Sequence, residues 1–318
     1  MKEFKDKVVL VTGGTGSIGS EIVRQLLKTE VTQIRIYSRD EHKQHELRQE
    51  LGASTRLTFL GGDVRDKDRL DFAFKGVDIC FHAAALKHVP FCEYNPFEAL
   101  KTNAIGTQNI IEVAIKNNLE KVIAISTDKA VSPESVLGAS KLMMERLVAA
   151  ANLIVGRSRT RFACVRFGNV VGSRGSVTHL WRSQIEKGGP VTVTHKRVNR
   201  FFMEIPEAVE LIFDAMRLMH GGEIFVLKMK KRLIIDLARE LIKKSSNGKK
   251  VAITFIGLRP GEKLDEVLFT KEESSHMLET KRMYIITPRH LVPDYNYHTS
   301  SYPGSRRASV SKPKSLKS

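Results

Sequence analysis

The chain has few of the features that mark secreted, zinc-bound or membrane-spanning proteins. Its 318 residues include three cysteines, Cys80, Cys92 and Cys164, which form no C-x-x-C pair and no disulfide framework. We therefore expect no structural zinc or other metal site. No apolar run approaches the ~20 residues that span a bilayer, and no N-terminal stretch resembles a signal peptide. These absences predict a soluble protein of a reducing cytoplasm, without a membrane span.

The formal net charge of +17 is unevenly distributed along the chain. Residues 228–250 carry nine basic and two acidic residues, and residues 289–318 carry six and one. No aromatic side chains are interleaved with these cations, as they are in nucleic-acid-binding modules. We interpret the two stretches as a solvated helix face and a disordered tail, and we expect no nucleic-acid partner. The charge still favours an anionic substrate.

Short β-branched apolar runs alternate with amphipathic stretches from residue 7 to about residue 128. The expected strands are 7–12, 34–37, 57–61, 77–82, 121–126 and 162–167. The expected helices include 21–28, 104–117, 138–151, 206–219 and 234–244, and residues 251–256 are expected to form a late strand. Such alternation predicts βαβ units with right-handed crossovers, and hence an α/β fold with a doubly wound parallel (Rossmann) sheet.

The alternation weakens after about residue 170, which suggests three parts. Residues 1–170 should form the dinucleotide-binding domain and contribute the catalytic residues. Residues 171–288 should form mainly a smaller C-terminal substrate-binding lobe. Residues 289–318, rich in Ser, Pro, Lys and Arg, read as a basic, disordered tail.

A glycine-rich turn connects the first expected strand to the first expected helix. Gly13 permits the tight turn, Gly16 lets the backbone approach a pyrophosphate, and Gly19 lets the helix pack on the sheet. The phosphates would meet the free N–H groups of the helix N-terminus. The remaining cofactor-binding candidates of this turn are Thr15, Ser17 and Ile18.

The end of the second expected strand bears on the choice of cofactor. Ser38, Arg39 and Lys43 could bind the 2′-phosphate of NADP. Asp40 and Glu41 keep NAD open, because a carboxylate there could bind ribose hydroxyls or lie at a solvated helix start. We favour NADP over NAD.

Further candidates follow the third and fifth expected strands. Asp63 and Val64 are placed to flank the adenine, although a loop-capping aspartate is an equal alternative. Residues 126–129, Ser-Thr-Asp-Lys, bring a hydroxyl, a carboxylate and an amine to the carboxyl end of a parallel strand, where open α/β sheets bind ligands. Lys141 lies on the following expected helix, where it either turns back toward the nicotinamide ribose or is a surface lysine.

By these motifs the chain resembles the extended short-chain dehydrogenase/reductases. The matching segments are Thr12–Gly19, His82–Ala85, Asn103–Thr107 and Lys141. Residues 37–41, 85–90, 93–96, 126–130, 168–176 and 259–263 are similar to the UDP-N-acetylglucosamine 4,6-dehydratases, most of all to the soluble, C5-inverting enzymes of pseudaminic acid synthesis. The resemblance covers about residues 4–288. It implies dinucleotide contacts from Ala83, Ala84, Ala85 and Asn103, and it favours a homo-oligomer.

The resemblance also implies a mechanism. Oxidation of the sugar C4 hydroxyl by NADP would acidify the C5 proton; Lys129 would remove that proton, Asp128 would protonate the departing C6 hydroxyl, and Thr127 would hydrogen-bond the C4 oxygen. The hydride would return to C6, so tight cofactor binding without net redox is expected. A lysine base needs a lowered pKa, which burial near other cations would promote.

One position departs from the family pattern. Reductases of this type carry tyrosine four residues before the helix lysine, where this chain has Leu137. Leucine carries no proton, so either Asp128 or a bound water accepts the C4 proton, or catalysis is crippled. Some related dehydratases have an apolar methionine at this place, and we expect an active enzyme.

Several basic and polar residues are candidates for binding the nucleotide-diphospho-sugar. Asn169, Arg174 and Arg259 follow expected strands and carry donors suited to a diphosphate. Lys87 follows the fourth strand and could line the sugar pocket. The resemblance adds His195, Arg200 and Glu262 around uridine, although each of these residues could instead be a surface charge or a loop cap.

Two rival functions remain open from the sequence. A nucleotide-sugar 4-epimerase shares the hydride step, but epimerisation needs neither the C6 acid nor the C5 base that Asp128 and Lys129 would supply. A non-catalytic regulatory or scaffold protein could keep the dinucleotide fold without turnover, and Leu137 keeps this reading open.

Overall fold

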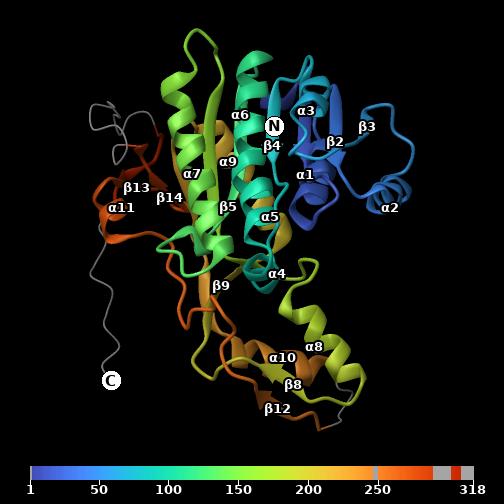
Figure 1. Cartoon of the computed structure of the whole chain (residues 1–318), viewed down its shortest axis with the longest axis vertical. Helices are drawn as coiled ribbons and strands as arrows, with labels where there is room; N and C mark the ends of the chain where they lie inside the picture. The colour runs from blue at the N-terminus through green and yellow to red at the C-terminus, as the bar shows by residue number, and fades with distance from the viewer. Residues whose placement is uncertain (1, 246–249, 289–301, 309–318) are drawn as a thin grey trace.

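The structure, a computed structural model, describes residues 2–245, 250–288 and 302–308. Within them a large sheet with helices on both faces forms the upper part of the molecule, and a smaller lobe lies at the lower end (Figure 1). None of the described helices is both long and apolar enough to cross a membrane.

The large sheet contains a parallel set and an antiparallel extension. The parallel strands are β1 (Val8–Thr12), β2 (Gln33–Ser38), β3 (Leu57–Gly61), β4 (Ile79–His82), β5 (Lys121–Thr127), β6 (Arg161–Phe167) and β10 (Ile224–Leu227). The antiparallel strands are β13 (Met277–Glu279), β14 (Met283–Ile286) and β15 (Arg306–Arg307). The spatial order is β15-β13-β14-β10-β6-β5-β4-β1-β2-β3. The order reverses between β1 and β4, as in a doubly wound sheet, and the six strands expected from the sequence are confirmed.

Side chains of the parallel strands alternate between two cores, because successive residues of a strand point to opposite faces. On β1, Val9 and Val11 enter one core and Leu10 enters the other. The first core is covered by α1 (Ser17–Leu27) and α9 (Ile205–Leu218). The second is covered by α3 (Lys67–Phe74), α6 (Gly106–Lys116) and α7 (Val136–Ile154). Both faces are therefore buried, as a parallel sheet requires.

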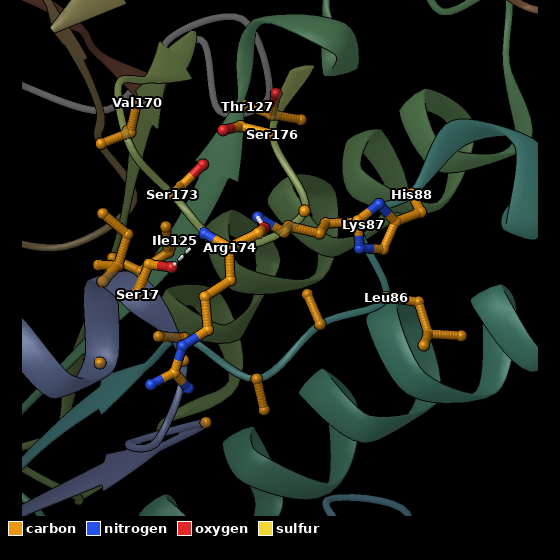
Figure 2. Close-up of a pocket in the computed structure, with 18 of the residues that line it drawn as sticks. Ser17, Leu86, Lys87, His88, Ile125, Thr127, Val170, Ser173, Arg174 and Ser176 are labelled. Carbon is orange, nitrogen blue, oxygen red and sulfur yellow. Dashed lines mark hydrogen bonds between the residues drawn. The ribbon is translucent and has the colours of Figure 1, made fainter. Parts of the chain in front are cut away.

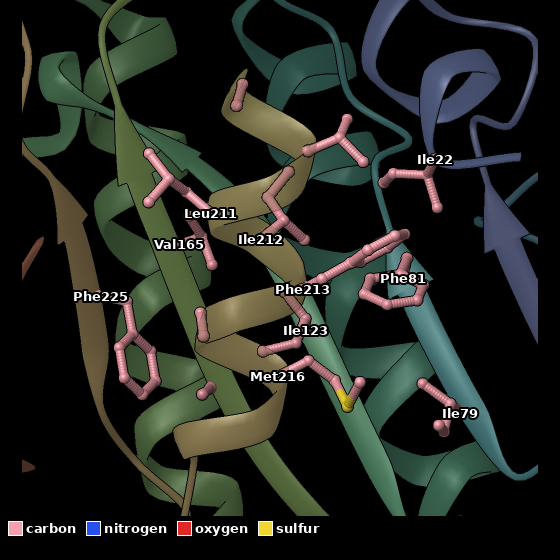
Figure 3. Packing of buried hydrophobic residues seen from close by; sticks show 14 of the residues in the cluster. Ile22, Ile79, Phe81, Ile123, Val165, Leu211, Ile212, Phe213, Met216 and Phe225 are labelled. Carbon is pink, nitrogen blue, oxygen red and sulfur yellow. The ribbon is translucent and has the colours of Figure 1, made fainter. Parts of the chain in front are cut away.

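Helix α9 links the later part of the chain to the first core. Its residue Phe213 packs against Phe81 of β4 with ring centroids 5.4 Å apart (Figure 3). Leu211, Ile212 and Met216 of the same helix are also in this cluster. A helix beyond residue 170 thus stabilises the large parallel sheet.

The remaining elements belong either to the upper part of the molecule or to the lower lobe. Those of the upper part are η1 (Lys2–Phe4), α2 (Glu41–Leu51), α4 (Val89–Tyr94), α5 (Pro96–Leu100), the π-helical turn η2 (Lys101–Ile105), η3 (Asp128–Ala130) and α11 (Lys271–Ser275). The lower lobe and its connection contain β7 (Asn169–Val170), α8 (Val177–Glu186), β8 (Val191–Val193), β9 (Asn199–Met203), β11 (Lys230–Leu233), α10 (Ile234–Ser245) and β12 (Ile253–Phe255).

The lower lobe has its own core around Trp181, which is fully buried with Val191, Val193 and Ile234. The chain enters and leaves this lobe more than once, because α9, β10, β13 and β14 return to the upper part. Residues 171–288 are therefore shared between the lobe and the large sheet, and a single boundary at residue 170 does not separate them.

Part of the expected disordered tail is structured. Tyr302 is buried and donates a hydrogen bond to Glu223 at 2.8 Å. Arg306 and Arg307 pair with β13 as an additional edge strand. The expectation of disorder does not hold for residues 302–308, because a burial site and a free sheet edge are available to them. The rest of residues 289–318 lies outside the described part of the chain.

Candidate functional site

A cavity of about 670 Å³ opens at the carboxyl ends of β1, β4, β5 and β6, where the strand order reverses. It has the size of a small-molecule or cofactor site. Fifteen of the sixteen expected cofactor residues line it: Gly13, Thr15, Gly16, Ser17, Ile18, Gly19, Ser38, Arg39, Lys43, Asp63, Val64, Ala83, Ala84, Ala85 and Lys141.

The glycine turn after β1 forms a cradle that side chains would fill. Gly13 has a positive φ of 64°, and a Cβ there would meet the backbone nitrogen of Ala84 at 2.6 Å. A Cβ at Gly19 would meet the carbonyl of Gly13 at 2.3 Å. Helix α1 begins at Ser17, and its N-cap residue, Gly16, has no side chain with which to cap it. The first N–H groups of α1 are therefore available to a phosphate, and the turn fits a dinucleotide pyrophosphate.

The residues after β2 form a polar wall. Ser38 Oγ lies 2.7 Å from Thr15 Oγ1. Asp40 is the N-cap of α2, accepting a hydrogen bond from Lys43 N at 3.0 Å, and it also pairs with the Lys43 side chain. The hydrogen bond from Lys43 lowers the pKa of Asp40. Asp40 is thus occupied by helix capping.

Asp63 lies at the cavity wall and also caps its own loop. It lines the cavity, and its carboxylate lies 3.2 Å from the guanidinium of Arg39. It also caps its own loop, because it accepts a hydrogen bond from Arg65 N at 2.9 Å. Burial raises the pKa of Asp63, but its bonds to Arg65 and the nearby Arg39 outweigh this effect and lower the pKa overall.

Asn103 is the one expected cofactor residue that does not line the cavity. It is buried, accepts a hydrogen bond from Leu86 N at 2.9 Å and donates one to Leu86 O at 3.0 Å. It also donates to Ser140 on α7. Asn103 therefore fixes the loop after β4, whose residues line the cavity, and acts on the site through the backbone.

The Thr127–Lys129 segment lies at the end of β5, and the structure divides it between the cavity wall and the interior. Thr127 and Lys129 line the cavity, whereas Asp128 is fully buried behind them. Asp128 Oδ1 accepts hydrogen bonds from Thr127 Oγ1 at 3.0 Å and from Lys129 Nζ at 3.1 Å. Its Oδ2 faces Gly168, where a Cβ would lie 2.9 Å away. Asp128 therefore meets the cavity only through its two neighbours.

Lys129 lies between two buried carboxylates. Its Nζ is 3.1 Å from Asp128 Oδ1 and 3.4 Å from Glu266 Oε1. Burial lowers the pKa of Lys129, but the two carboxylates outweigh burial and raise the pKa above its usual value. The neighbouring side chains therefore do not supply the lowered pKa that a lysine base needs, because the charges nearest to the amine are anions.

Lys141 is buried on α7 and is not a surface lysine. Its Nζ donates a hydrogen bond to the carbonyl of Ile125 on β5 at 2.8 Å, and burial lowers its pKa to about 8. Leu137, one turn earlier, also lines the cavity and packs with Cys92 and Ala99. Leucine thus fills with apolar atoms the place where the family pattern has a phenol.

Three expected substrate residues, Lys87, Asn169 and Arg174, line the cavity. Figure 2 shows Lys87 and Arg174 among its lining residues. Arg174 reaches back to the glycine turn: its backbone nitrogen donates to Ser17 Oγ at 2.9 Å and its guanidinium donates to Thr15 O at 2.8 Å. Lys87 donates to the carbonyl of Arg174 at 2.7 Å. The loop that carries Arg174 is therefore held against the glycine turn.

The other four substrate candidates do not line this cavity. Arg200 and Glu262 form an ion pair of 3.1 Å, and Glu262 also accepts a hydrogen bond from Arg259 N. His195 accepts a hydrogen bond from Arg197 N at 3.2 Å through its Nδ1. Arg200, Glu262 and Arg259 are thus linked to one another outside the cavity, whereas His195 has a separate contact.

The structure adds site residues that the sequence did not indicate. Thr102, in the π-helical turn η2, lines the cavity, and its hydroxyl has no hydrogen-bond partner among the described residues. His88 lines the cavity beside Gly175. Glu266 contacts Lys129 from a distant loop. His88 lies within the family-like segment 85–90, and Glu266 lies three residues after the Arg-Pro-Gly-Glu-Lys segment that ends at Lys263, whereas Thr102 had no sequence signal.

Three curated relatives match almost the whole chain. An uncharacterized membrane protein of Methanocaldococcus jannaschii is 53% identical over 90% of this chain and 87% of its own length. The inverting UDP-N-acetylglucosamine 4,6-dehydratase of Campylobacter jejuni is 43% identical over 90% and 84%. A UDP-glucose 4-epimerase of Rickettsia bellii is 42% identical over 89% and 83%.

Solved structures show the same fold. The X-ray structure of Pen from Bacillus thuringiensis superposes with a TM-score of 0.88 at 43% identity, covering 90% of both chains. DesIV, a dTDP-glucose 4,6-dehydratase of Streptomyces venezuelae, superposes with a TM-score of 0.75 at 22% identity, covering 84% and 90%. The predicted α/β dinucleotide fold is confirmed.

The family pattern described as "polysaccharide biosynthesis protein" matches residues 9–288, which include the glycine turn, the Thr127–Lys129 segment and the Arg200–Glu262 ion pair. The chain belongs to this family.

Proposed function

We propose that this protein is a nucleotide-sugar 4,6-dehydratase, a carbon–oxygen lyase that converts UDP-N-acetylglucosamine to a UDP-2-acetamido-2,6-dideoxy-4-hexulose with inversion at C5. The observation that carries the proposal is the meeting of Thr127, Lys129 and Lys141 in one cavity with the glycine turn. Identity of 43% to an inverting dehydratase supports the substrate and the stereochemistry. We place the reaction in the synthesis of a surface glycan, such as one built from pseudaminic acid, and we note that 47% identity to a capsular polysaccharide biosynthesis protein supports such a role.

The chain's own groups suit the required proton transfers. A bound nicotinamide dinucleotide supplies the chemistry of accepting hydride from C4 and returning it to C6. Thr127 Oγ1 holds the C4 oxygen. Asp128 is buried behind Thr127, so it takes the C4 proton and delivers it to the departing C6 hydroxyl through the Thr127 hydroxyl that it contacts. Lys129, as free amine, removes the C5 proton. Lys141, whose pKa is about 8, can hold or release a proton at the cavity wall.

NADP is the cofactor that we propose. Ser38, Arg39 and Lys43 line the cavity beside the glycine turn, and their donors suit a 2′-phosphate. Of the two carboxylates that could contact ribose, Asp40 is occupied by capping α2 and Glu41 does not line the cavity. NAD would be favoured if titration with the two oxidised dinucleotides gave the tighter binding for NAD.

Two further parts of the proposal concern location and assembly. The three cysteines are free and buried, which suits a reducing cytoplasm. The exposed aromatic residues Phe91, Tyr94 and Phe97 of α4 and α5 suit contacts between copies of the chain. We expect a homo-oligomer, which sedimentation of the purified protein would test.

A 4-epimerase is the second candidate, because relatives with that name are 42% identical. It would need no group to remove the C5 proton, whereas Lys129, which lines the cavity, carries an amine that could do so. A non-catalytic dinucleotide-binding protein is the third candidate, and turnover separates it from both enzymes.

The test is incubation of the purified chain with UDP-N-acetylglucosamine in deuterated water, followed by NMR and mass spectrometry. A dehydratase removes one water from the sugar and introduces deuterium at C5, and the C5 configuration shows inversion or retention. A product of unchanged mass with inverted C4 would establish an epimerase. An unchanged sugar with dinucleotide bound would contradict both.

A further inference from the structure

Glu266 is buried, and among the described residues Lys129 is the side chain with which it forms an ion pair. The side chains of Glu266 and Asp128 are 4% and 0% exposed, and both lie within 3.5 Å of Lys129 Nζ. Among the described residues, neither Glu266 Oε2 nor Asp128 Oδ2 has a hydrogen-bond partner. Burying a carboxylate with an unsatisfied oxygen is costly, so such a group in a folded protein calls for an explanation such as catalysis.

The segment around Glu266 is fixed to the sheet on both sides. Upstream, Lys263 Nζ donates to the carbonyl of Val131, just after the catalytic turn, at 3.1 Å. Downstream, the carbonyl of Leu268 accepts a hydrogen bond at 2.9 Å from Arg166, a fully buried residue of β6. Glu266 is thus held against Lys129 by the fold itself, not by a mobile loop contact.

We propose that Glu266 is a positioning residue of the dehydration step, which holds the amine of Lys129 in the cavity and stabilises the positive charge that the amine gains. This inference rests on the proposed function. Glu266 does not line the cavity, so it acts through Lys129 and not on the sugar.

The charge change at Lys129 gives Glu266 its effect. As the C5–H bond breaks, its electron pair passes into the 4-keto system, and the proton forms a new N–H bond at Lys129 Nζ. The ammonium that results lies between Asp128 and Glu266. A fixed anion beside a developing cation lowers the barrier most in a site with little water. The same anion favours the ammonium at rest, so a higher pH is needed to free the amine.

Two substitutions separate charge from shape. Glu266→Gln keeps the side-chain size and removes the charge; we expect kcat to fall at least about tenfold with KM within about twofold, as for a group acting mainly in the transition state. The pH limb on which activity rises should move to lower pH, because Glu266 raises the pKa of Lys129. Glu266→Asp keeps the charge on a shorter side chain. We therefore expect a reduced kcat, while the pH range over which activity rises stays as in wild type.

The matched control is Asp265→Asn, the same chemical change at the neighbouring residue. Asp265 pairs with Lys231 at 2.7 Å, but both side chains are exposed by more than 40%. We expect wild-type kcat and pH dependence for this variant.

The outcomes distinguish this inference from the proposed function. If the wild-type chain leaves UDP-N-acetylglucosamine unchanged, the proposed function fails. If wild type turns over and Glu266→Gln keeps both its kcat and its pH limb, the role of Glu266 is overturned while the function stands. If Glu266→Gln does not fold, Glu266→Asp decides, since wild-type kcat in that variant would overturn the inference. The pH dependence of Lys129 acetylation, followed by mass spectrometry, reports the charge effect without turnover, and it too should move to lower pH in Glu266→Gln.

Discussion

The two sides of the cavity are built from the chain in different ways. The dinucleotide side comes mostly from β1, α1, β2 and the start of α2, which follow one another within the first 43 residues. The catalytic side joins distant segments: Lys129 at the end of β5 meets Glu266 from a loop after β12, and Arg174 crosses to Thr15 from 159 residues away. One side is a local motif, and the other is a product of the tertiary fold.

The ion pairs differ in the same way. Arg39 and Asp63 on the dinucleotide side have side chains that are 53% and 22% exposed, and such pairs contribute little to stability. Arg166 and Glu145, which lie behind the catalytic side, are both 1% exposed, and Glu145 also accepts a hydrogen bond from Ser126. Buried pairs tolerate the loss of one partner poorly. The catalytic side should therefore be the more sensitive to single substitutions.

The largest effect should come from Lys129→Ala, which removes the proposed base from the catalytic side. We expect dehydration to fall by about 100- to 10,000-fold, the usual contribution of a general base, while the dinucleotide stays bound. Product formation by NMR and dinucleotide content by absorbance measure the two sides separately. The exposed lysine Lys230 of β11 provides the control, since Lys230→Ala should keep full activity. Turnover at the wild-type rate in Lys129→Ala would show that Lys129 is not the base.

The next largest effect is expected from Gly13→Ala, on the dinucleotide side, and it should be a loss of dinucleotide affinity. The new Cβ would lie 2.6 Å from Ala84 N, at a residue whose φ is 64°, so the turn must shift. Backbone strain of this kind costs ~1–3 kcal/mol, and we therefore expect dinucleotide affinity to fall by about tenfold or more. Gly52→Ala is the matched control, because Gly52 has a φ of 72° and no atom within 4 Å of the added Cβ. Calorimetric titration with NADP compares them, and equal affinities would show that the cradle is not needed.

The difference between the two sides also explains what the sequence could predict. The parallel strands and the glycine turn follow from local periodicity and glycine spacing, and they are confirmed. The charge state of Lys129 could not be predicted, because Glu266 is remote in sequence. The same holds for Lys228 in the basic stretch 228–250, which pairs at 3.2 Å with Glu279, 51 residues away. The sequence alone led us to interpret that stretch as a solvated helix face.

The smallest effect is expected at Leu137, where the catalytic side departs from the family pattern. Leu137→Tyr restores a phenol one turn before Lys141, and it should leave kcat unchanged or raise it by less than about tenfold, because Asp128 already serves the C4 proton in our proposal. The larger ring replaces a side chain packed with Cys92 and Ala99, and overpacking costs ~1–3 kcal/mol.

Leu137→Phe supplies the control for that substitution, since it adds the ring without the hydroxyl. A rise in kcat with tyrosine but not with phenylalanine would show that a phenol can still join the proton transfers. An equal, large loss in both variants would show that the cavity has been rebuilt around leucine. Since Leu137 lines the cavity and is 3% exposed, the catalytic side would then depend on packing as much as on its ionisable groups.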